Sequence, residues 1–211
     1  MKPDFRRRIP SRGNELNRIS TGKQEERHSA DLPVTTPHQL DPVSTVESAV
    51  REALASSASK MGLGNVGAVI SHMKEGSSMA FNYYNYNIAK QLAEVLGSWD
   101  TEIRAVYTHD YEGATPEEAG LEDAPSSSLI HMIIWAERKT KALDALLETI
   151  DHAMVRHHKQ MLGLSRLRHV LDAQVVDDED VRSRTGYAVL LRSIYEPPIQ
   201  IWRSSGPGIQ G

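Results

Sequence analysis

The central apolar run of the chain reads Leu129-Ile-His-Met-Ile-Ile-Trp-Ala136, and seven of its eight residues are apolar. A strand that is covered on both faces has this composition, whereas a half-solvated strand alternates between apolar and polar residues. A long amphipathic segment follows, with Thr140 as its cap, Gly163 as its end and an apolar stripe of Leu143, Leu146, Leu147, Ile150, Met154 and Met161. The sequence therefore predicts a buried strand that leads into a long helix, and both belong to the core.

Seven further elements are predicted on either side of this pair. Helical spacing indicates a helix over Ser44–Met61 and another from Ser77 or Ser78 to Leu96, with Gly97 as its stop signal. Glu102–Tyr111 alternates as an edge strand does. The remaining predicted elements are strands over Val66–Ile70, His169–Val176 and Ile199–Trp202, and a C-terminal helix over Asp178–Tyr195 for which a strand over Tyr187–Ile194 is the alternative.

The order of these elements predicts an α+β fold. With Val66–Ile70 as the first strand, the order becomes strand, helix, strand, strand, helix, strand, which is the ferredoxin-like βαββαβ sandwich with an N-terminal and a C-terminal helix added. In that topology the first and third strands are central and the second and fourth lie at the edges. Both long helices would cover one face of a four-stranded sheet.

Composition predicts a single domain between two tails. Residues 1–42 are polar and carry eight Lys or Arg against four Asp or Glu up to residue 28, so we expect a disordered basic tail. Residues 43–203 form the predicted α+β domain, and 204–211 a flexible C-terminal tail. The chain has no cysteine, a formal net charge of −4 and no apolar run long enough to span a membrane, so we expect a soluble, cytoplasmic protein without disulfides.

One glycine-rich motif resembles a dinucleotide-binding fingerprint in spacing alone. Gly62-Leu63-Gly64-Asn65-Val66-Gly67 fits G-x-G-x-x-G, but a helix precedes it, and no acidic residue lies near Asn82–Asn87, about 20 residues further on. We therefore interpret it as a turn and expect no cofactor.

Two clusters are candidates for binding a small ligand or a phosphate. Arg138, Lys139 and Lys141 surround the predicted start of the long helix, where free backbone N–H groups favour anions, although they could instead pair with the acidic stretch 112–123. Tyr83, Asn85 and Tyr86 lie in the preceding helix, where they could stack on and hydrogen-bond a ligand or form ordinary half-exposed surface.

Other charged clusters have simpler explanations than catalysis. Asp177–Asp180 with His109 and Asp110 could supply magnesium ligands, but helix capping explains the acids without a metal. The histidines His152, His157 and His158 do not have the i, i+4 spacing of a metal-binding pair. We therefore expect neither a catalytic site nor a metal site. The alternative is a ligand-binding or phosphate-binding domain that acts as a metal-dependent enzyme and uses the basic start of the helix near Thr140.

The leading functional hypothesis is a non-catalytic interaction or assembly module. Both faces of the central strand are too apolar for water, and the two long helices cover only one of them. The other face would then form a homodimer interface of Leu129, His131, Ile133, Trp135 and Tyr107, with His109 at its rim, unless the C-terminal helix folds back over it. A different protein partner is an alternative, as is nucleic acid bound through the basic residues 5–12; no membrane contact is expected.

Overall fold

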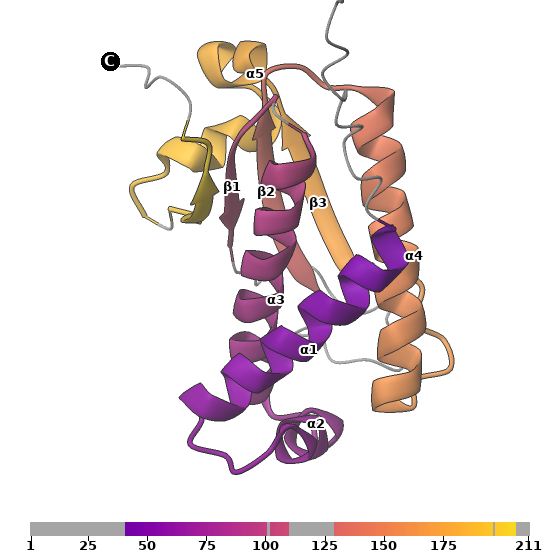
Figure 1. The fold of residues 1–211 in the computed structure, drawn as a ribbon. Coiled ribbons are helices and arrows are strands. Elements are labelled where there is room, and N and C mark those ends of the chain that lie inside the picture. Colours follow the sequence, from indigo (N-terminus) through magenta and orange to yellow (C-terminus); the bar gives the residue numbers. More distant parts are fainter. Residues whose placement is uncertain (1–40, 101, 110–128, 196, 206–211) are drawn as a thin grey trace, which may run out of the picture. The chain divides into compact units, whose positions relative to one another are not determined.

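A four-stranded mixed sheet forms the centre of the fold, as the computed structural model of the chain shows (Figure 1). The structure describes residues 41–100, 102–109, 129–195 and 197–205. The strand order is β3 (Leu171–Val176), β2 (Ile130–Ala136), β1 (Ile103–Thr108), β4 (Ile199–Arg203). β1 pairs antiparallel with both β2 and β4, and β2 pairs parallel with β3. The predicted α+β class is therefore confirmed.

The predicted ferredoxin-like order is wrong, and the error starts at Val66–Ile70. These residues begin a helix, α2 (Val66–Lys74), because Asn65 caps it: the Asn65 side-chain oxygen accepts a hydrogen bond from the Ala68 N–H at 3.0 Å. Three helices therefore precede the first strand. In the observed sheet the parallel neighbours β2 and β3 are joined through a helix, whereas all neighbours in a ferredoxin-like sheet are antiparallel.

The position of one strand also differs from the prediction. β2 is central, as expected, and five of its seven residues are buried. β1 was predicted as an edge strand, but it lies between β2 and β4, and the edges are β3 and β4. The alternating pattern of β1 misleads because its polar residue Arg104 is half-buried rather than exposed, and three of its six residues are buried.

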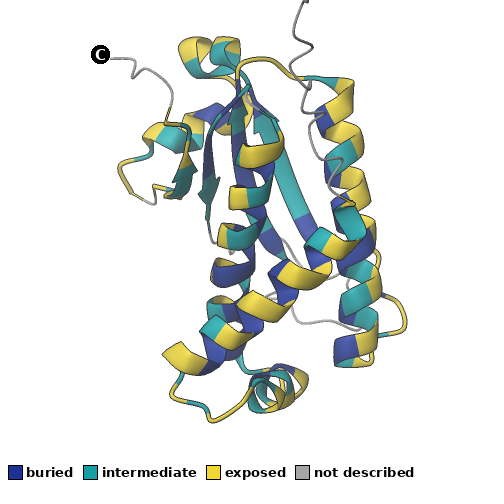
Figure 2. Cartoon of the chain, viewed as in Figure 1, coloured by how far each residue is buried: buried dark blue, intermediate teal, exposed yellow. Residues whose placement is uncertain are grey.

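Three long helices cover one face of the sheet, in two layers. α3 (Ser78–Trp99) packs on β1, β2 and β4, and α4 (Lys141–Leu162) packs on β3. α1 (Pro42–Lys60) crosses over both of these helices (Figure 1). Buried residues concentrate on the sides of these helices that face one another and the sheet (Figure 2). The prediction that both long helices lie on one face is thus confirmed.

The helix ends follow the predicted signals with one exception. Thr140 caps α4 by accepting from the Leu143 N–H at 3.1 Å, and Gly163 ends it with a left-handed φ of 76°. The predicted stop at Gly97 is wrong, because α3 continues through it to Trp99. Gly97 instead leaves room for a neighbour: a Cβ atom built there would lie 2.0 Å from Cζ2 of Trp202 on β4.

The predicted C-terminal helix is split into two short pieces. α5 (Asp178–Ser183) ends at Arg184, which has a left-handed φ of 55°, and a 3-10 helix, η2 (Gly186–Arg192), follows. The alternative of a strand over Tyr187–Ile194 is also wrong. Ala188 of η2 packs with Ile133 and Val176 on the sheet face opposite to α3 and α4. The C-terminal segment therefore covers part of the second face.

Several predicted features lie outside the described residues. They are the basic tail up to residue 40, the acidic stretch 112–123, Asp110 and the last six residues. Among the helices that are described, none is both long enough and apolar enough to cross a membrane.

Candidate interaction surface and ligand groove

The basic residues at the start of α4 are already paired within the chain. Arg138 Nη2 lies 2.5 Å from Glu102 Oε1, and Lys139 Nζ lies 2.5 Å from Asp180 Oδ2. These partners belong to the α3–β1 connection and to α5 rather than to the acidic stretch 112–123. Lys141 is exposed and forms no ion pair with a described residue. Two of the three charges of the predicted anion site are thus compensated.

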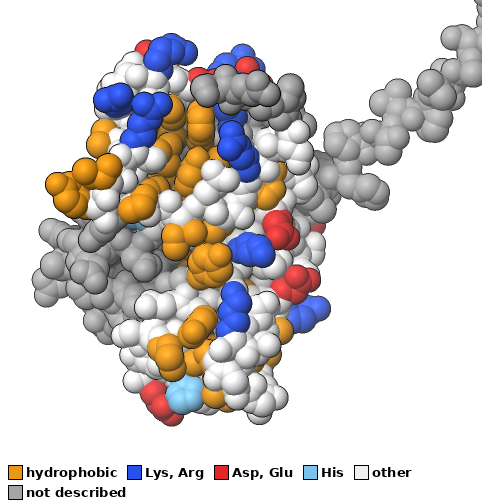
Figure 3. All heavy atoms as spheres, turned by 90° about the vertical axis from the view of Figure 1, so that its left-hand side faces the viewer, with side chains coloured by type: hydrophobic (Ala, Val, Ile, Leu, Met, Phe, Trp, Pro, Cys, Tyr) orange, Lys and Arg blue, Asp and Glu red, His pale blue; other side chains and the backbone are white. Residues whose placement is uncertain are grey.

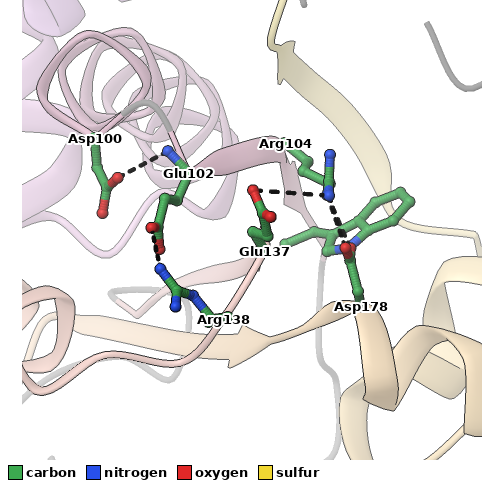
Figure 4. A network of polar contacts seen from close by, with 7 residues as sticks. Asp100, Glu102, Arg104, Glu137, Arg138 and Asp178 are labelled. Carbon is green, nitrogen blue, oxygen red and sulfur yellow. Dashed lines mark hydrogen bonds and ion pairs between the residues drawn. The ribbon is translucent and has the colours of Figure 1, made fainter.

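A second ion pair fastens α5 to the sheet (Figure 4). The Arg104 guanidinium on β1 donates two parallel bonds to the Asp178 carboxylate, from Nε to Oδ1 at 2.9 Å and from Nη2 to Oδ2 at 2.7 Å. Trp135 Nε1 donates to the same Oδ1 at 2.9 Å. The bonds from Arg104 hold the pKa of Asp178 below its ordinary value. Figure 4 shows that this set lies beside, and apart from, the Arg138–Glu102 pair.

The acids 177–180 act in helix capping and ion pairing. The Asp177 side chain accepts from the Asp180 N–H at 2.9 Å, and the Asp180 side chain accepts from the Asp177 N–H at 3.2 Å, which is a capping box. Within the described ranges no group of three or more His, Asp or Glu residues is placed to hold a metal ion.

The predicted dimer face is largely occupied in the single chain. Ile133 is fully buried, and Trp135 and Tyr107 are half-buried against the α5–η2 segment. Leu129 packs against the core on the helix side instead. Ile133 therefore has no surface left to offer a second copy.

His131 belongs to a polar cluster that ties β2 to β3. Its Nδ1 lies 2.9 Å from Asp172 Oδ2, and Gln174 Nε2 donates to Asp172 Oδ1 at 2.6 Å. These bonds lower the pKa of Asp172, the one with His131 most strongly. The His109 ring lies 5.5 Å from the His131 ring. Since His131 and Asp172 are paired in the parallel register, the cluster locks the register of these strands.

The tyrosine cluster of α3 forms one wall of an open groove of about 560 Å³, lined by Lys60, Met79, Asn82, Tyr83 and Tyr86. Asn85 points elsewhere, because its Nδ2 donates to the Leu129 carbonyl at 3.0 Å. Tyr83 and the residues around Arg138 lie near opposite ends of α3, about 24 Å apart along the helix axis at 1.5 Å per residue. The structure therefore does not combine the two predicted binding clusters.

Lys60 was not among the residues predicted from the sequence. Lys60 Nζ donates to Asn87 Oδ1 at 2.8 Å, Asn87 Nδ2 donates to Ser57 Oγ at 2.9 Å, and Ser57 Oγ donates to the Ala53 carbonyl at 2.7 Å. Ser57 and Asn87 are buried. We call this series of hydrogen bonds, from Lys60 through Asn87 and Ser57 to the Ala53 carbonyl, the relay. Ser57 and Asn87 each lie on the apolar stripe of their helix, and a polar residue on such a stripe is the sequence signal for a buried hydrogen bond.

A further surface was missed because its residues were interpreted as the inner stripe of a helix. Leu190 and Leu191 do pack against Ile133, but their neighbours face outward. We call this area the C-terminal surface: the exposed apolar side chains of Tyr187, Val189, Ile194, Tyr195 and Ile199, bordered by the exposed Arg184, Arg192 and Arg203. Ile194 and Tyr195 are 84% and 89% exposed. Figure 3 views this side of the molecule and shows hydrophobic side chains at the surface with Lys and Arg beside them.

Comparisons of this chain with protein-family models, with curated proteins and with solved structures found no match.

Proposed function

We propose that this domain is a non-catalytic interaction module that self-associates through its C-terminal surface. The observation that carries the proposal is the concentration of exposed apolar side chains in one short segment: five of the eight large hydrophobic residues that are exposed in the described chain lie between residues 187 and 199. The largest exposed apolar patch of a monomer, roughly 300–600 Å², is often a functional contact site.

The size and composition of the C-terminal surface support a protein partner. Two tyrosines and three aliphatic side chains at these exposures offer on the order of 500 Å² of apolar surface, more than half of the ~800 Å² that each partner buries in a standard interface. Tyr and Arg are enriched at the centres of protein interfaces, and an Arg guanidinium can stack on an aromatic ring of the partner. A second copy would supply both groups.

The contact would be made by side chains rather than by extension of the sheet. β4 is an edge strand, but Pro197 and Pro198 precede it, Arg203 ends it, and its register with β1 is shifted at Ile201. Proline, a bulge, a terminal charge and a length of only five residues are the features that oppose edge-to-edge pairing.

The arginines give self-association a distinctive salt dependence. Arg184, Arg192 and Arg203 form no ion pair with a described residue, so a two-fold contact brings like charges together. Raising the salt from about 0.05 M to about 0.5 M screens this repulsion. We therefore expect the dissociation constant to fall as salt increases, which is the opposite of the behaviour of a contact with an acidic partner.

Sedimentation velocity on the full chain at micromolar concentration, at both salt concentrations, tests the proposal. We expect a reversible dimer or larger assembly that strengthens with salt. Ile194→Asp should weaken it at least tenfold, because a carboxylate would replace an apolar contact. Ile194 is almost fully exposed, so this substitution should leave the stability of the monomer unchanged.

Met79→Asp is the matched control, since Met79 is 60% exposed but lies on α3. It should leave the association constant unaltered. A monomer under all conditions, or equal effects of the two substitutions, would contradict self-association through the C-terminal surface.

A further inference from the structure

The groove beside Tyr83 and Tyr86 has the dimensions of a small-molecule site. Its volume of about 560 Å³ lies within the range of roughly 300–1,000 Å³ that is typical of ligand pockets. It lies between the last turn of α1, which supplies Lys60, and the first turns of α3, which supply the other lining residues. It is thus formed by two long helices that pack closely on each other, which gives the site a rigid frame.

Lys60 is the cation among the described lining residues, and it is held in place before a ligand binds. The buried relay from Ala53 through Ser57 and Asn87 ends at the Lys60 ammonium, and the Lys60 Nζ also lies 5.0 Å from the centre of the Tyr86 ring. A lysine side chain normally loses conformational entropy when it binds an anion. Because the relay already restricts Lys60, less of that entropy is lost on binding. The bond to Asn87 uses one N–H of the ammonium, which leaves two donors.

The charge around the groove favours an anion. Among the described residues, no carboxylate lines the groove and none pairs with Lys60. The α3 residues from Ser78 to Ala93 include no Asp or Glu, while Lys90 lies one turn beyond Tyr86 on the same side of the helix. Within the described part of the chain, no carboxylate therefore compensates the charge of Lys60, and the other lining residues are uncharged.

The aromatic walls favour a flat ligand. Tyr83 and Tyr86 are three residues apart on α3, so their side chains are neighbours on the helix surface. Lys60 occupies one face of the Tyr86 ring, and Met79 lies one turn before Tyr83. Asn82 is exposed and adds an amide that can both donate and accept hydrogen bonds.

We propose that this groove binds a small ligand that combines a flat aromatic ring with one anionic group. The ring stacks on Tyr83 and Tyr86, the Asn82 amide bonds to the polar edge of the ring, and Lys60 pairs with the anion. Nucleoside monophosphates and aromatic carboxylates share this chemistry. The proposal is independent of self-association, because the groove shares no residue with the C-terminal surface.

Isothermal titration calorimetry on the full chain tests it with matched ligand pairs. Adenosine monophosphate is compared with adenosine, and indole acetate with indole acetamide; inorganic phosphate and acetate test the anion alone. We expect at least one charged ligand to bind at least fivefold more tightly than its neutral counterpart and than the free anion. A difference in affinity between adenosine monophosphate and adenosine would identify the ligand class as nucleotides. A difference between indole acetate and indole acetamide would identify it as aromatic acids.

Two variants locate the site. Lys60→Gln should abolish the preference for the charged ligand, since glutamine can still donate to Asn87 but carries no charge. Tyr83→Leu should weaken both members of the preferred pair about tenfold without touching the relay. Arg51→Gln is the matched control, because it removes an exposed cation of α1, the helix that carries Lys60, at a residue that does not line the groove.

The proposal is overturned if no ligand binds at millimolar concentration, if the charged and neutral members bind equally, or if phosphate or acetate alone binds as tightly as the full ligand. An equal effect of Arg51→Gln and Lys60→Gln would also overturn it.

Discussion

The free energy of unfolding should depend on pH through one buried histidine, His158. This residue lies on α4 with its ring 5.4 Å from that of Tyr84, and it is 1% exposed. Its Nδ1 lies 2.9 Å from the Met154 carbonyl oxygen, which only accepts, so Nδ1 carries the proton of the neutral ring. No described residue bonds to Nε2. A second proton would therefore create a buried cation whose new N–H lacks an acceptor.

Burial accordingly lowers the pKa of His158 from 6.5 to about 4. Between these two values the unfolded chain binds a proton that the folded chain does not. The contribution of His158 to stability is thus complete above pH 6.5 and is lost as the pH falls toward 4. A difference of about two and a half pKa units corresponds to about 3 kcal/mol, at 1.36 kcal/mol per unit.

Urea unfolding at a series of pH values between about 7 and about 4 measures this effect. We expect the free energy of unfolding of the native chain to fall by about 3 kcal/mol more over this interval than that of His158→Leu, which cannot titrate. His152→Leu is the matched control, because His152 is exposed on the same helix, and it should keep the native pH dependence. The carboxylates with lowered pKa values, such as Asp172 and Asp178, lose their contribution at lower pH than this interval. Identical pH profiles for the native chain and His158→Leu would refute the reasoning.

Two further substitutions test the packing of the sheet. Gly97→Ala should favour the helix by up to about 1 kcal/mol through its higher helix propensity. We nevertheless expect the free energy of unfolding, measured in urea, to fall by roughly 1–3 kcal/mol, because the new Cβ would collide with the Trp202 ring. A gain in stability would show that Trp202 moves aside freely. Asp178→Asn should destabilise the chain by about 1 kcal/mol, since it removes the charge opposite Arg104 while keeping an acceptor for Trp135. Its effect should appear as faster amide hydrogen exchange in η2, and unchanged exchange there would contradict the role of this pair in holding α5–η2 on the sheet.

Local signals determined which elements could be predicted. The apolar run of β2 and the capping residue Thr140 act over a few residues, so the strand and the start of α4 follow from the sequence. The periodicity of Val66–Ile70 is misleading because a five-residue apolar segment fits a strand and a buried helix equally well, and the capping residue Asn65 just before it favours the helix. The strand order failed for a different reason. Pairing of β4 with β1 joins residues more than 90 positions apart, and no local periodicity records such a contact.

The same distinction applies to the candidate sites. Tyr83 and Tyr86 were correctly grouped because they are neighbours on one helix, and the structure places both in one groove. The sequence places Arg138 at an anion site because no local pattern reveals its ion-pair partner Glu102, which lies 36 residues earlier in the chain. Lys60 was missed because it meets the tyrosines only through the packing of α1 on α3. Residues within one helix can be combined from the sequence, whereas residues from two helices need the fold.

The C-terminal surface follows from how the second face of the sheet is covered. A strand that is apolar on both faces must be packed against other residues on both. The sequence predicts two possibilities for the second face, which are another subunit and the C-terminal segment. The structure uses the C-terminal segment, but η2 is only seven residues long and a 3-10 helix has three residues per turn. Ala188 and Leu191, three residues apart, therefore face the sheet together, while Tyr187 and Val189 are left on the outside. This short cover buries the apolar face of β2 but exposes apolar side chains of its own, and for this reason we propose that self-association uses the C-terminal surface rather than the sheet.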